Sequence, residues 1–362
     1  MSNPGRCLRV SLGWFKALWS TLLLAPALSA CSTHDAARSR HWSQLPPLPD
    51  ARGVAAPFAG VSGGVLLVAG GANFPDKMPW EGGQKVWHDD VYALTAPDAR
   101  WQSVGKLPCP LAYGVAITTE AGVACIGGSD GERHYEDVLL LVFTNGLLTV
   151  HSLPSLPLPL ANAAGARVGS TIYVAGGSDR PGEQSALSHC YALDLARKTP
   201  AWAAVAPCPG KPRILPVAAA LGGSFYLVGG AALEPTNGRV ARVYLRDAWR
   251  YQPGHGWQRI ADLPKPCVAG PTPAPAVDGG FLLLGGDDGS RTGFQPLAQH
   301  PGFPATILAY DAESDTWREN GKVPAPRVTV PTAYWRDRVV IPSGELRPGV
   351  RSPEVWTFRR GL

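Results

Sequence analysis

The chain has 362 residues, with 33 Lys and Arg, 28 Asp and Glu, and a formal net charge of +5. Residues 1–30 carry three positive charges and no negative one, so the remainder carries +2, which gives no electrostatic reason to expect nucleic acid as a partner. Gly (42) and Pro (36) are abundant without a collagen-like period in a chain that is 45% hydrophobic. This composition indicates many turns in a folded protein and excludes a disordered chain.

The first thirty residues have the features of an export signal. Three basic residues precede an apolar stretch from Ala17 to Leu28, which is too short for a good membrane span. Small residues then lead into Cys31, in a pattern that resembles a bacterial lipoprotein signal, where the Cys becomes the lipidated first residue. We therefore expect residues 1–30 to be removed and a lipid on Cys31 to hold the protein at a membrane surface. An ordinary signal peptide with an incidental Cys31 is the alternative.

Either signal directs the body of the protein out of the cytoplasm. Ser32 follows the Cys, and by resemblance to enteric lipoproteins the absence of Asp at this position favours the outer membrane. We expect a periplasmic protein that is lipid-anchored at the outer membrane. Residues 31–40 would form a linker and residues 41–362 a single folded domain.

Five cysteines remain once Cys7 is cleaved away and Cys31 is lipidated. They contain no CxxC pair and no zinc-type spacing, so we expect no metal site. An odd number leaves at least one thiol unpaired within a monomer, and the spacing identifies no disulfide pair. The five are Cys109, Cys125, Cys190, Cys208 and Cys267.

An apolar run that ends in Gly-Gly, or in Ser-Gly in the last copy, recurs six times after residue 41. The final residues of the copies are 49 to 58 residues apart: Gly71, Gly128, Gly177, Gly230, Gly286 and Gly344. After each comes a variable loop, a strand with aromatic or branched residues, and a strand that usually opens with Trp. These tryptophans are Trp101, Trp202, Trp257 and Trp317. Four strands per unit at this period are typical of the Kelch repeat of a β-propeller.

The residue types and the ends of the domain agree with this interpretation. A Gly pair lets the backbone turn where blades crowd, and a Trp supplies apolar area to fill the gap between blades. The domain begins with a lone outer strand at His41–Leu45 and ends with a third strand at Val355–Phe358. Their pairing would complete the sixth blade and close the ring. We predict an all-β fold, a six-bladed Kelch-type β-propeller closed by an N-terminal outer strand that pairs with the C-terminal blade.

The alternating direction of the strands sorts the loops of each blade onto two faces. The linkers between blades share a face with the loops between second and third strands, and these are the long and varied loops. Hairpins on the other face are short. Because long loops on a rigid scaffold usually carry binding sites, we expect the site at this mouth.

Several polar residues should gather at the mouth. The linkers bring Arg52, Arg213 and Arg327 near the starts of innermost strands, and a loop brings Asn73. A ring of guanidinium groups suits an anionic ligand, since Arg binds a carboxylate with two parallel hydrogen bonds. The alternative for each linker arginine is a structural role that bonds blade to blade.

Two stretches carry a family resemblance. Pro342–Trp356 reads PSGELRPGVRSPEVW, which is similar to the NGE-x-x-PG-x-R-T-x-x-V loop of the N-acetylneuraminate mutarotase (epimerase) family. Val68–Leu94 is similar to the family's long GGA-x-F loop. The family is a six-bladed Kelch propeller that interconverts the anomers of sialic acid. Here the Glu-bearing blade is last and the GGA-x-F blade first, which resembles the cyclically permuted branch, and a closed ring tolerates permutation because its ends meet.

The resemblance also implies roles for individual residues. Glu345 corresponds to the family's proposed proton acceptor, and Arg351 to its substrate-binding Arg, which would grip the carboxylate of the sugar. Mutarotation needs a base for the anomeric hydroxyl proton and an acid for the ring oxygen, and it needs no cofactor. The acid is left open between water and His88. The alternative is that Glu345 and Arg351 only pair across their loop.

Two other functions remain open. The same mouth can belong to a non-catalytic binder of a glycan or a protein, since one fold hosts many functions. A copper-oxidase propeller would need converging histidines, and the eight histidines of this chain are scattered without a ligand-like pair.

Overall fold

The computed structural model describes residues 40–182, 184–236 and 238–359. The signal sequence, Cys31 and all but the last residue of the linker lie outside the described residues. Signal removal, lipidation and outer-membrane anchoring therefore stay predictions. Within the described part, no helix has the length and apolar character needed to cross a bilayer.

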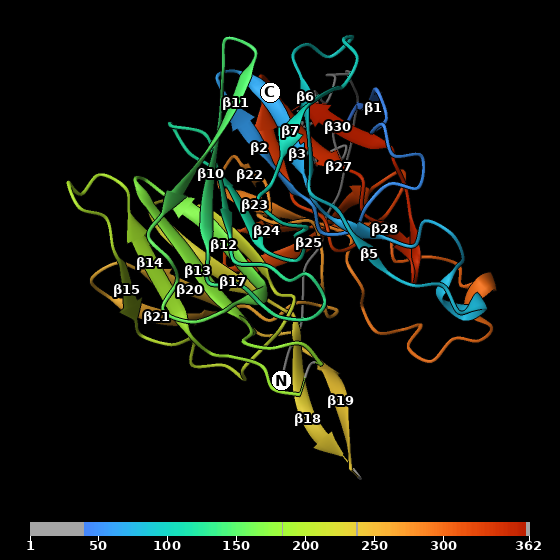
Figure 1. Ribbon diagram of the computed structural model, residues 1–362. Helices are drawn as coiled ribbons and strands as arrows, with labels where there is room; N and C mark the ends of the chain where they lie inside the picture. Colours follow the sequence, from blue (N-terminus) through green and yellow to red (C-terminus); the bar gives the residue numbers. More distant parts are fainter. Residues whose placement is uncertain (1–39, 183, 237, 360–362) are drawn as a thin grey trace, which may run out of the picture. The chain divides into compact units, whose positions relative to one another are not determined.

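Six four-stranded antiparallel sheets form the fold, and they are coloured in chain order in Figure 1. Blade 1 contains β2 (Phe58–Ser62), β3 (Val65–Ala69), β6 (Asp90–Leu94) and β7 (Gln102–Lys106). Blade 2 contains β8 (Val115–Thr118), β9 (Val123–Ile126), β10 (Val138–Thr144) and β11 (Leu147–Leu153). Blade 3 contains β12 (Ala161–Val168), β13 (Thr171–Ser178), β14 (Cys190–Asp194) and β15 (Trp202–Val205).

The second half of the chain repeats the pattern. Blade 4 contains β16 (Val217–Leu221), β17 (Ser224–Val228), β20 (Ala248–Gln252) and β21 (Gly256–Ile260). Blade 5 contains β22 (Ala276–Val277), β23 (Gly280–Leu284), β24 (Thr306–Asp311) and β25 (Thr316–Lys322). Blade 6 contains β26 (Ala333–Trp335), β27 (Arg338–Pro342) and β30 (Val355–Arg359), with β1 (Trp42–Leu45) as its fourth strand. The predicted all-β, six-bladed propeller is confirmed.

The ring closes through the pairing of the two ends of the domain. β1 lies antiparallel to β30, in a register that runs from Trp42 opposite Phe358 to Leu45 opposite Val355. The rings of Trp42 and Phe358 are in contact, with centroids 4.6 Å apart. Figure 1 shows the blue β1 beside the red β30. The predicted closure of blade 6 by the N-terminal strand is therefore present.

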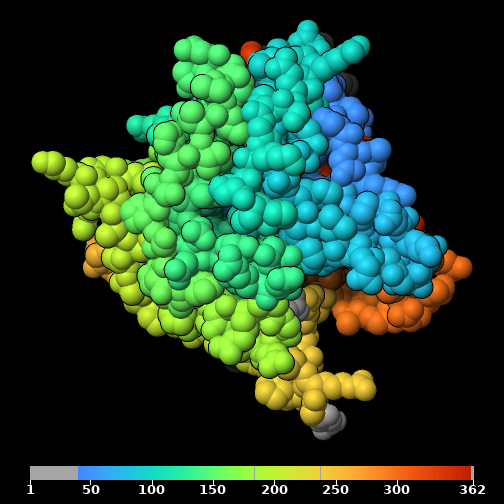
Figure 2. All heavy atoms as spheres, in the orientation of Figure 1, coloured from blue at the N-terminus to red at the C-terminus, as the bar shows by residue number. Residues whose placement is uncertain are grey.

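Smaller elements decorate the loops between second and third strands. Two-stranded hairpins form from β4 (Ala72–Asn73) with β5 (Val86–Trp87), from β18 (Ala231–Thr236) with β19 (Arg239–Tyr244), and from β28 (Glu345–Arg347) with β29 (Val350–Arg351). The 3₁₀ helices are η1 (Pro79–Glu81) and η2 (Leu297–Gln299). The β18–β19 hairpin is the yellow projection in Figure 2.

The Gly pairs serve close approach between neighbouring blades. Gly70 has φ of +62°, and a Cβ there would lie 2.2 Å from the carbonyl oxygen of Leu111, in the linker to the next blade. Ser343 takes the place of the first Gly in blade 6, at φ of +66°. Its hydroxyl accepts a hydrogen bond from the Val54 N–H at 2.7 Å and donates to the Ser352 carbonyl at 2.7 Å. These bonds offset the strain of a side chain in this backbone region.

The four tryptophans that open outer strands join each blade to the one before it. In every case the indole N–H donates to the backbone carbonyl that directly follows the outer strand of the preceding blade. The acceptors and distances are Pro46 for Trp101 (2.8 Å), Pro154 for Trp202 (2.8 Å), Ala206 for Trp257 (2.7 Å) and Ala261 for Trp317 (2.8 Å). The Trp side chain thus adds a directional bond to the apolar contact expected from the sequence.

Apolar side chains fill the spaces between adjacent blades. Phe58 and Leu67 of blade 1 pack with Val123 and Leu141 of blade 2 in one buried cluster. Corresponding clusters join the other blades, so each blade shares its core with its two neighbours. The core is therefore distributed around the ring.

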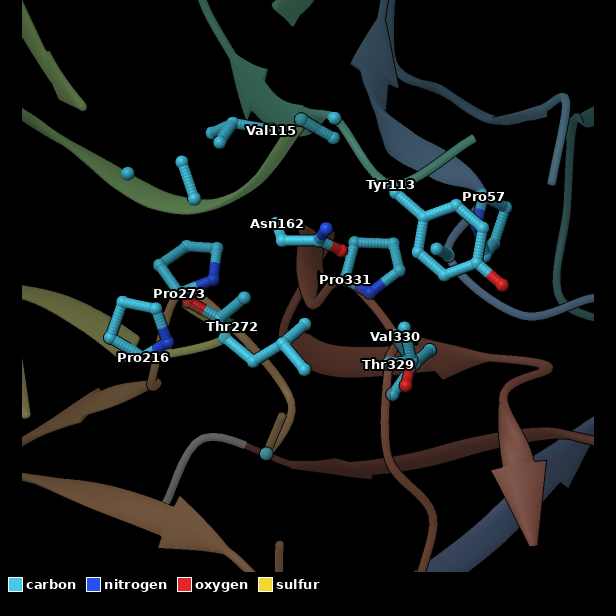
Figure 3. A pocket seen from close by; sticks show the side chains of 17 residues that line it. Pro57, Tyr113, Val115, Asn162, Pro216, Thr272, Pro273, Thr329, Val330 and Pro331 are labelled. Atoms are coloured by element: carbon cyan, nitrogen blue, oxygen red, sulfur yellow. The ribbon is translucent and has the colours of Figure 1, made fainter. Parts of the chain in front are cut away.

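A closed circle of backbone hydrogen bonds lies at the centre. Six residues, one at the entry to each innermost strand, adopt left-handed φ angles between 51° and 63°, and each N–H donates to the carbonyl of the equivalent residue in the preceding blade at 2.7–3.2 Å. We call them the central ring: Ala56, Tyr113, Asn162, Leu215, Ala269 and Thr329. On one side they border a hollow of about 50 Å³, shown in Figure 3 with Tyr113, Asn162 and Thr329 in its wall.

Candidate active site

A larger cavity, of about 330 Å³, lies on the other side of the central ring, at the mouth where linkers and long loops meet. Its walls come from the loops of blades 1, 4, 5 and 6 and from ring residues. The charged lining residues are Lys85, Arg242, Asp287, Glu345 and Arg351. The face that strand alternation predicted is the face that holds this cavity, and we call it the mouth cavity.

Glu345 and Arg351 are brought together by the β28–β29 hairpin. They are direct cross-strand partners, the register shifts by one residue between Glu345 and Arg347, and both side chains line the cavity. Arg351 Nη2 lies 3.4 Å from Glu345 Oε2, while Glu345 Oε1 accepts a hydrogen bond from the Gly349 N–H at 2.9 Å. The side chains are 4% and 17% exposed, so the pair is largely shielded from solvent.

The guanidinium of Arg351 is buried but incompletely bonded. Its Nε and Nη1 atoms have no hydrogen-bond partner among the described residues, and only Nη2 faces Glu345. An unsatisfied buried donor costs about 1–3 kcal/mol, and more when it is charged. The free Nε–H and Nη1–H lie on different edges of the guanidinium. The edge formed by Nη1 and Nη2 has the geometry that binds a carboxylate with two parallel hydrogen bonds, and an anion there would satisfy Nη1.

Phe74 supports two cations at the same wall. The guanidinium carbon of Arg351 lies 4.8 Å from the centre of the Phe74 ring, and Lys85 Nζ lies 5.9 Å from it. Lys85 Nζ is also 5.5 Å from the ring of Trp87 and 5.3 Å from that of Tyr113. Cation–π contacts of this length hold a charged group in place without neutralising it. Lys85 therefore adds a second positive charge to the cavity, which the sequence did not point out.

Arg213 and Arg327 occupy equivalent positions behind the Gly turns of blades 4 and 6. Arg213 donates two parallel hydrogen bonds to Asp247, at 2.6 and 3.0 Å, and one to the Gly229 carbonyl. Arg327 donates to the Ser343 carbonyl at 2.6 Å and to Glu354 at 3.2 Å. Both side chains are at least 98% buried. The geometry therefore favours the structural alternative for these two arginines, because their donors are already occupied.

Asn73, His88 and Arg52 are also outside the lining of the mouth cavity. The amide of Asn73 is buried and donates to Asp50 Oδ2 at 2.7 Å and to the Gly53 carbonyl at 2.9 Å, and its oxygen faces His88 Nε2 at 2.9 Å. These bonds hold the start of blade 1, and they turn the His88 ring toward Asn73. Arg52 is exposed to solvent. Binding roles for Arg52 and Asn73 stay predictions, which these contacts do not support.

Asp287 is a second carboxylate at the mouth cavity. It follows the Gly pair of blade 5 as Glu345 follows the Ser-Gly pair of blade 6, and each pairs as an isolated bridge with the linker residue before the central ring. Asp287 Oδ2 accepts a hydrogen bond from the Tyr244 hydroxyl at 2.7 Å, and Oδ1 accepts one from the Gly289 N–H at 3.0 Å. Alignment of the six repeats on their Gly pairs would have identified it.

Metal-binding groups and disulfides can be assessed only over residues 40–182, 184–236 and 238–359. There, no group of three or more His, Cys, Asp or Glu is arranged to hold a metal ion. The five cysteines of this part are free thiols. Burial raises the pKa of Cys125, Cys190, Cys208 and Cys267, which keeps these thiols protonated and unreactive.

A family model of N-acetylneuraminate epimerase matches residues 29–150 and 153–290, which is more than half of the chain. The chain belongs to the N-acetylneuraminate epimerase family. Membership of this family was predicted from the loops of blades 1 and 6. Glu345 and Arg351 lie beyond the matched residues, so their roles within the family rest on the loop motif and the geometry.

Curated relatives carry the same family name. N-acetylneuraminate epimerase from Brucella suis is 39% identical over 128 residues, which cover 31% of this chain and 32% of the relative. The protein of that name from Haemophilus influenzae is 33% identical over 145 residues, covering 35% and 38%. The one from Yersinia enterocolitica is 44% identical over 107 residues, covering 25% and 27%. The chain thus matches about a third of the length of these relatives.

The fold has a close counterpart among solved structures. The structure of YjhT superposes with a TM-score of 0.65 at 15% identity, and the match covers 86% of this chain and 96% of that one. At this identity the likeness concerns the fold alone.

Proposed function

We propose that the protein is a mutarotase that interconverts the anomers of N-acetylneuraminate or of a closely similar 2-keto sugar acid. Membership of the N-acetylneuraminate epimerase family supports the reaction class. The observation that carries the proposal for this chain is the 3.4 Å separation between Arg351 Nη2 and Glu345 Oε2 at the wall of one cavity.

This separation suits one class of sugar acid. In a 2-keto sugar acid the carboxylate is bonded directly to the anomeric carbon, so the anomeric hydroxyl lies next to it. In a hexuronic acid the ring oxygen and another ring carbon stand between them. A guanidinium that grips the carboxylate and a base that reaches the anomeric hydroxyl must therefore be neighbours for the first class only.

The proposed reaction uses the two residues in different roles. The edge of Arg351 formed by Nη1 and Nη2, on which Nη1 is free, binds the sugar carboxylate, and Lys85 adds a second positive charge at the same wall. Glu345 takes the proton of the anomeric hydroxyl while the bond between the anomeric carbon and the ring oxygen breaks. The ring oxygen takes up a proton from water, since the His88 ring is engaged by Asn73. The open-chain ketone rotates, and the ring hydroxyl attacks its other face while giving its proton back to the hydroxide formed from water. Glu345 returns its proton to the new anomeric oxygen.

Anomer equilibration tests the proposal directly. Freshly dissolved N-acetylneuraminate is followed by NMR with the wild-type protein and with Glu345→Gln, which keeps the shape of the side chain but removes its basicity. We expect wild type to accelerate equilibration and Glu345→Gln to lose roughly 10²–10⁴-fold of the acceleration, the usual contribution of a general base. Equal rates for the two proteins would remove Glu345 from the mechanism.

Two controls separate this function from mere binding of an anion. Glu313→Gln changes an exposed carboxylate in the β24–β25 hairpin and should match wild type. Glucuronate carries its carboxylate away from the anomeric carbon, so its mutarotation should not be accelerated. Binding of N-acetylneuraminate without any acceleration by wild type would favour the alternative of a non-catalytic glycan binder.

A further inference from the structure

A second cavity, of about 310 Å³, adjoins the mouth cavity on the side of blade 5. The two share four wall residues: Arg242, Asp287, Phe303 and Pro348. Each cavity alone is at the lower end of the roughly 300–1,000 Å³ that ligand sites span, whereas the two joined are in the middle of that range. The second cavity uses none of the residues assigned to the proposed reaction.

The wall of the second cavity is rich in neutral hydrogen-bonding groups. Tyr244, Thr292, Gln295 and His300 line it. The His300 ring is buried, and its Nδ1 accepts a hydrogen bond from the Gly302 N–H at 3.1 Å, which leaves Nε2 for a ligand. Burial, together with the charge of Arg291, lowers the pKa of His300, so the ring is a neutral partner at neutral pH.

The charged side chains at this cavity are those of Arg242, Arg291 and Asp287. Arg291 Nη1 donates to the Gly302 carbonyl at 2.5 Å and so braces the loop. The Asp287 carboxylate lies at the junction of the two cavities, with one oxygen held by the Tyr244 hydroxyl and the other by the Gly289 N–H. Its remaining lone pairs can accept hydrogen bonds from hydroxyl groups.

We propose that the second cavity binds the hydroxylated side chain of the sugar acid, with Asp287 as the acceptor at the junction. The site would then select sugar acids that extend beyond the ring by a polyhydroxylated arm. This inference deepens the proposed function and rests on it for the choice of sugar. Arg351 fixes the carboxylate end of the ligand, and Asp287, one blade away, fixes the direction in which the rest of the molecule extends.

Two sugars that differ only in the arm provide the test. N-acetylneuraminate has a nine-carbon chain, and its seven-carbon analogue, made by periodate cleavage and reduction, keeps the ring, the carboxylate and the anomeric centre. Dissociation constants are measured by calorimetry, and anomer equilibration is followed in parallel by NMR. We expect wild type to bind the nine-carbon sugar roughly tenfold more tightly, as one or two hydrogen bonds would produce.

Two variants change the second cavity without large changes in shape. Asp287→Asn and Thr292→Val should each reduce the preference for the nine-carbon sugar toward one. Arg239→Ala, on the same β19 strand that carries Tyr244 but outside both cavity walls, should retain the full preference. Equal affinity of wild type for the two sugars would overturn the inference, as would a preference that both variants retain. A preference that the variants abolish, in a protein without turnover, would support the subsite and refute the mutarotase function.

Discussion

The contrast between two buried arginines of blade 6 gives the sharpest prediction. Arg351 and Arg327 are both buried beside a carboxylate, but Arg327 has its donors occupied and Arg351 has two that are free. Substitution of each by Met removes the charge and keeps most of the apolar volume. Arg351→Met should lose sugar binding and keep its stability, whereas Arg327→Met should lose stability and keep sugar binding.

The expected magnitudes follow from the contacts. Arg351→Met loses a cation–π contact and leaves the mostly buried Glu345 without its ion-pair partner, about 3–5 kcal/mol together, and it relieves two unsatisfied donors of about 1–3 kcal/mol each. Its stability should therefore stay within about 2 kcal/mol of wild type. Loss of two charge-assisted bonds to the sugar carboxylate should weaken binding by roughly 10²–10⁴-fold.

Arg327→Met removes bonds to three backbone carbonyls and to the Glu354 side chain. Breaking a fully buried pair costs about 3–5 kcal/mol, but the Glu354 side chain is 43% exposed and can be rehydrated, so we expect about 2–4 kcal/mol. Sugar binding per folded molecule should be preserved, because Arg327 does not line the mouth cavity.

Urea unfolding and sugar calorimetry on the two variants measure both quantities. Unfolding is followed by tryptophan fluorescence. Binding is measured without urea, at a temperature at which both variants are folded. The distinction between a functional and a structural arginine is refuted if Arg351→Met is as unstable as Arg327→Met and still binds N-acetylneuraminate with wild-type affinity.

Three further predictions concern the central ring, the pH dependence of stability and the lipidation of Cys31. Ala56→Gly should change the free energy of unfolding in urea by less than about 0.5 kcal/mol, because relief of the strained left-handed backbone offsets the usual cost of replacing Ala by Gly. Ala59→Gly, in the regular strand β2, has no such relief and should lower the free energy of unfolding by about 1–2 kcal/mol. Although burial opposes it, hydrogen bonds from Arg213 and Trp249 hold the pKa of Asp247 below its ordinary 3.8, so the stability advantage of wild type over Asp247→Asn should be full at neutral pH and shrink as the pH falls below about 4 in pH-dependent thermal unfolding. Cys31→Ala should abolish incorporation of labelled palmitate and release the protein from the membrane fraction, and unchanged labelling would place the lipid elsewhere.

The architecture was predictable because it is repeated. Six copies of one pattern, each with a Gly pair and most with a Trp, determine the number of blades, and the unpaired strand at each end determines the closure. The central ring was not predictable, since Ala, Tyr, Asn, Leu and Thr have no common preference for left-handed backbone. Its conformation is imposed by the ring of hydrogen bonds between blades.

The contacts of the predicted site residues could be anticipated only in part. Proximity to an innermost strand was taken to mean proximity to the channel for Arg213 and Arg327. Both arginines lie two residues before a residue of the central ring, and their side chains point behind the glycine turn of their blade. There each binds an acid, Asp247 or Glu354, that also accepts a hydrogen bond from a Trp of the third strand. Asp287 is in the same register as Glu345, but no family motif in the sequence identifies it.

The seam between β1 and β30 also sets the order of events in folding. The strand that completes the last blade is made first, so it has no partner until the far end of the chain has been synthesised. The ring of blades can therefore be sealed only once β30 has been made. Until then the sixth blade lacks its third strand, and β1 has no edge to pair with.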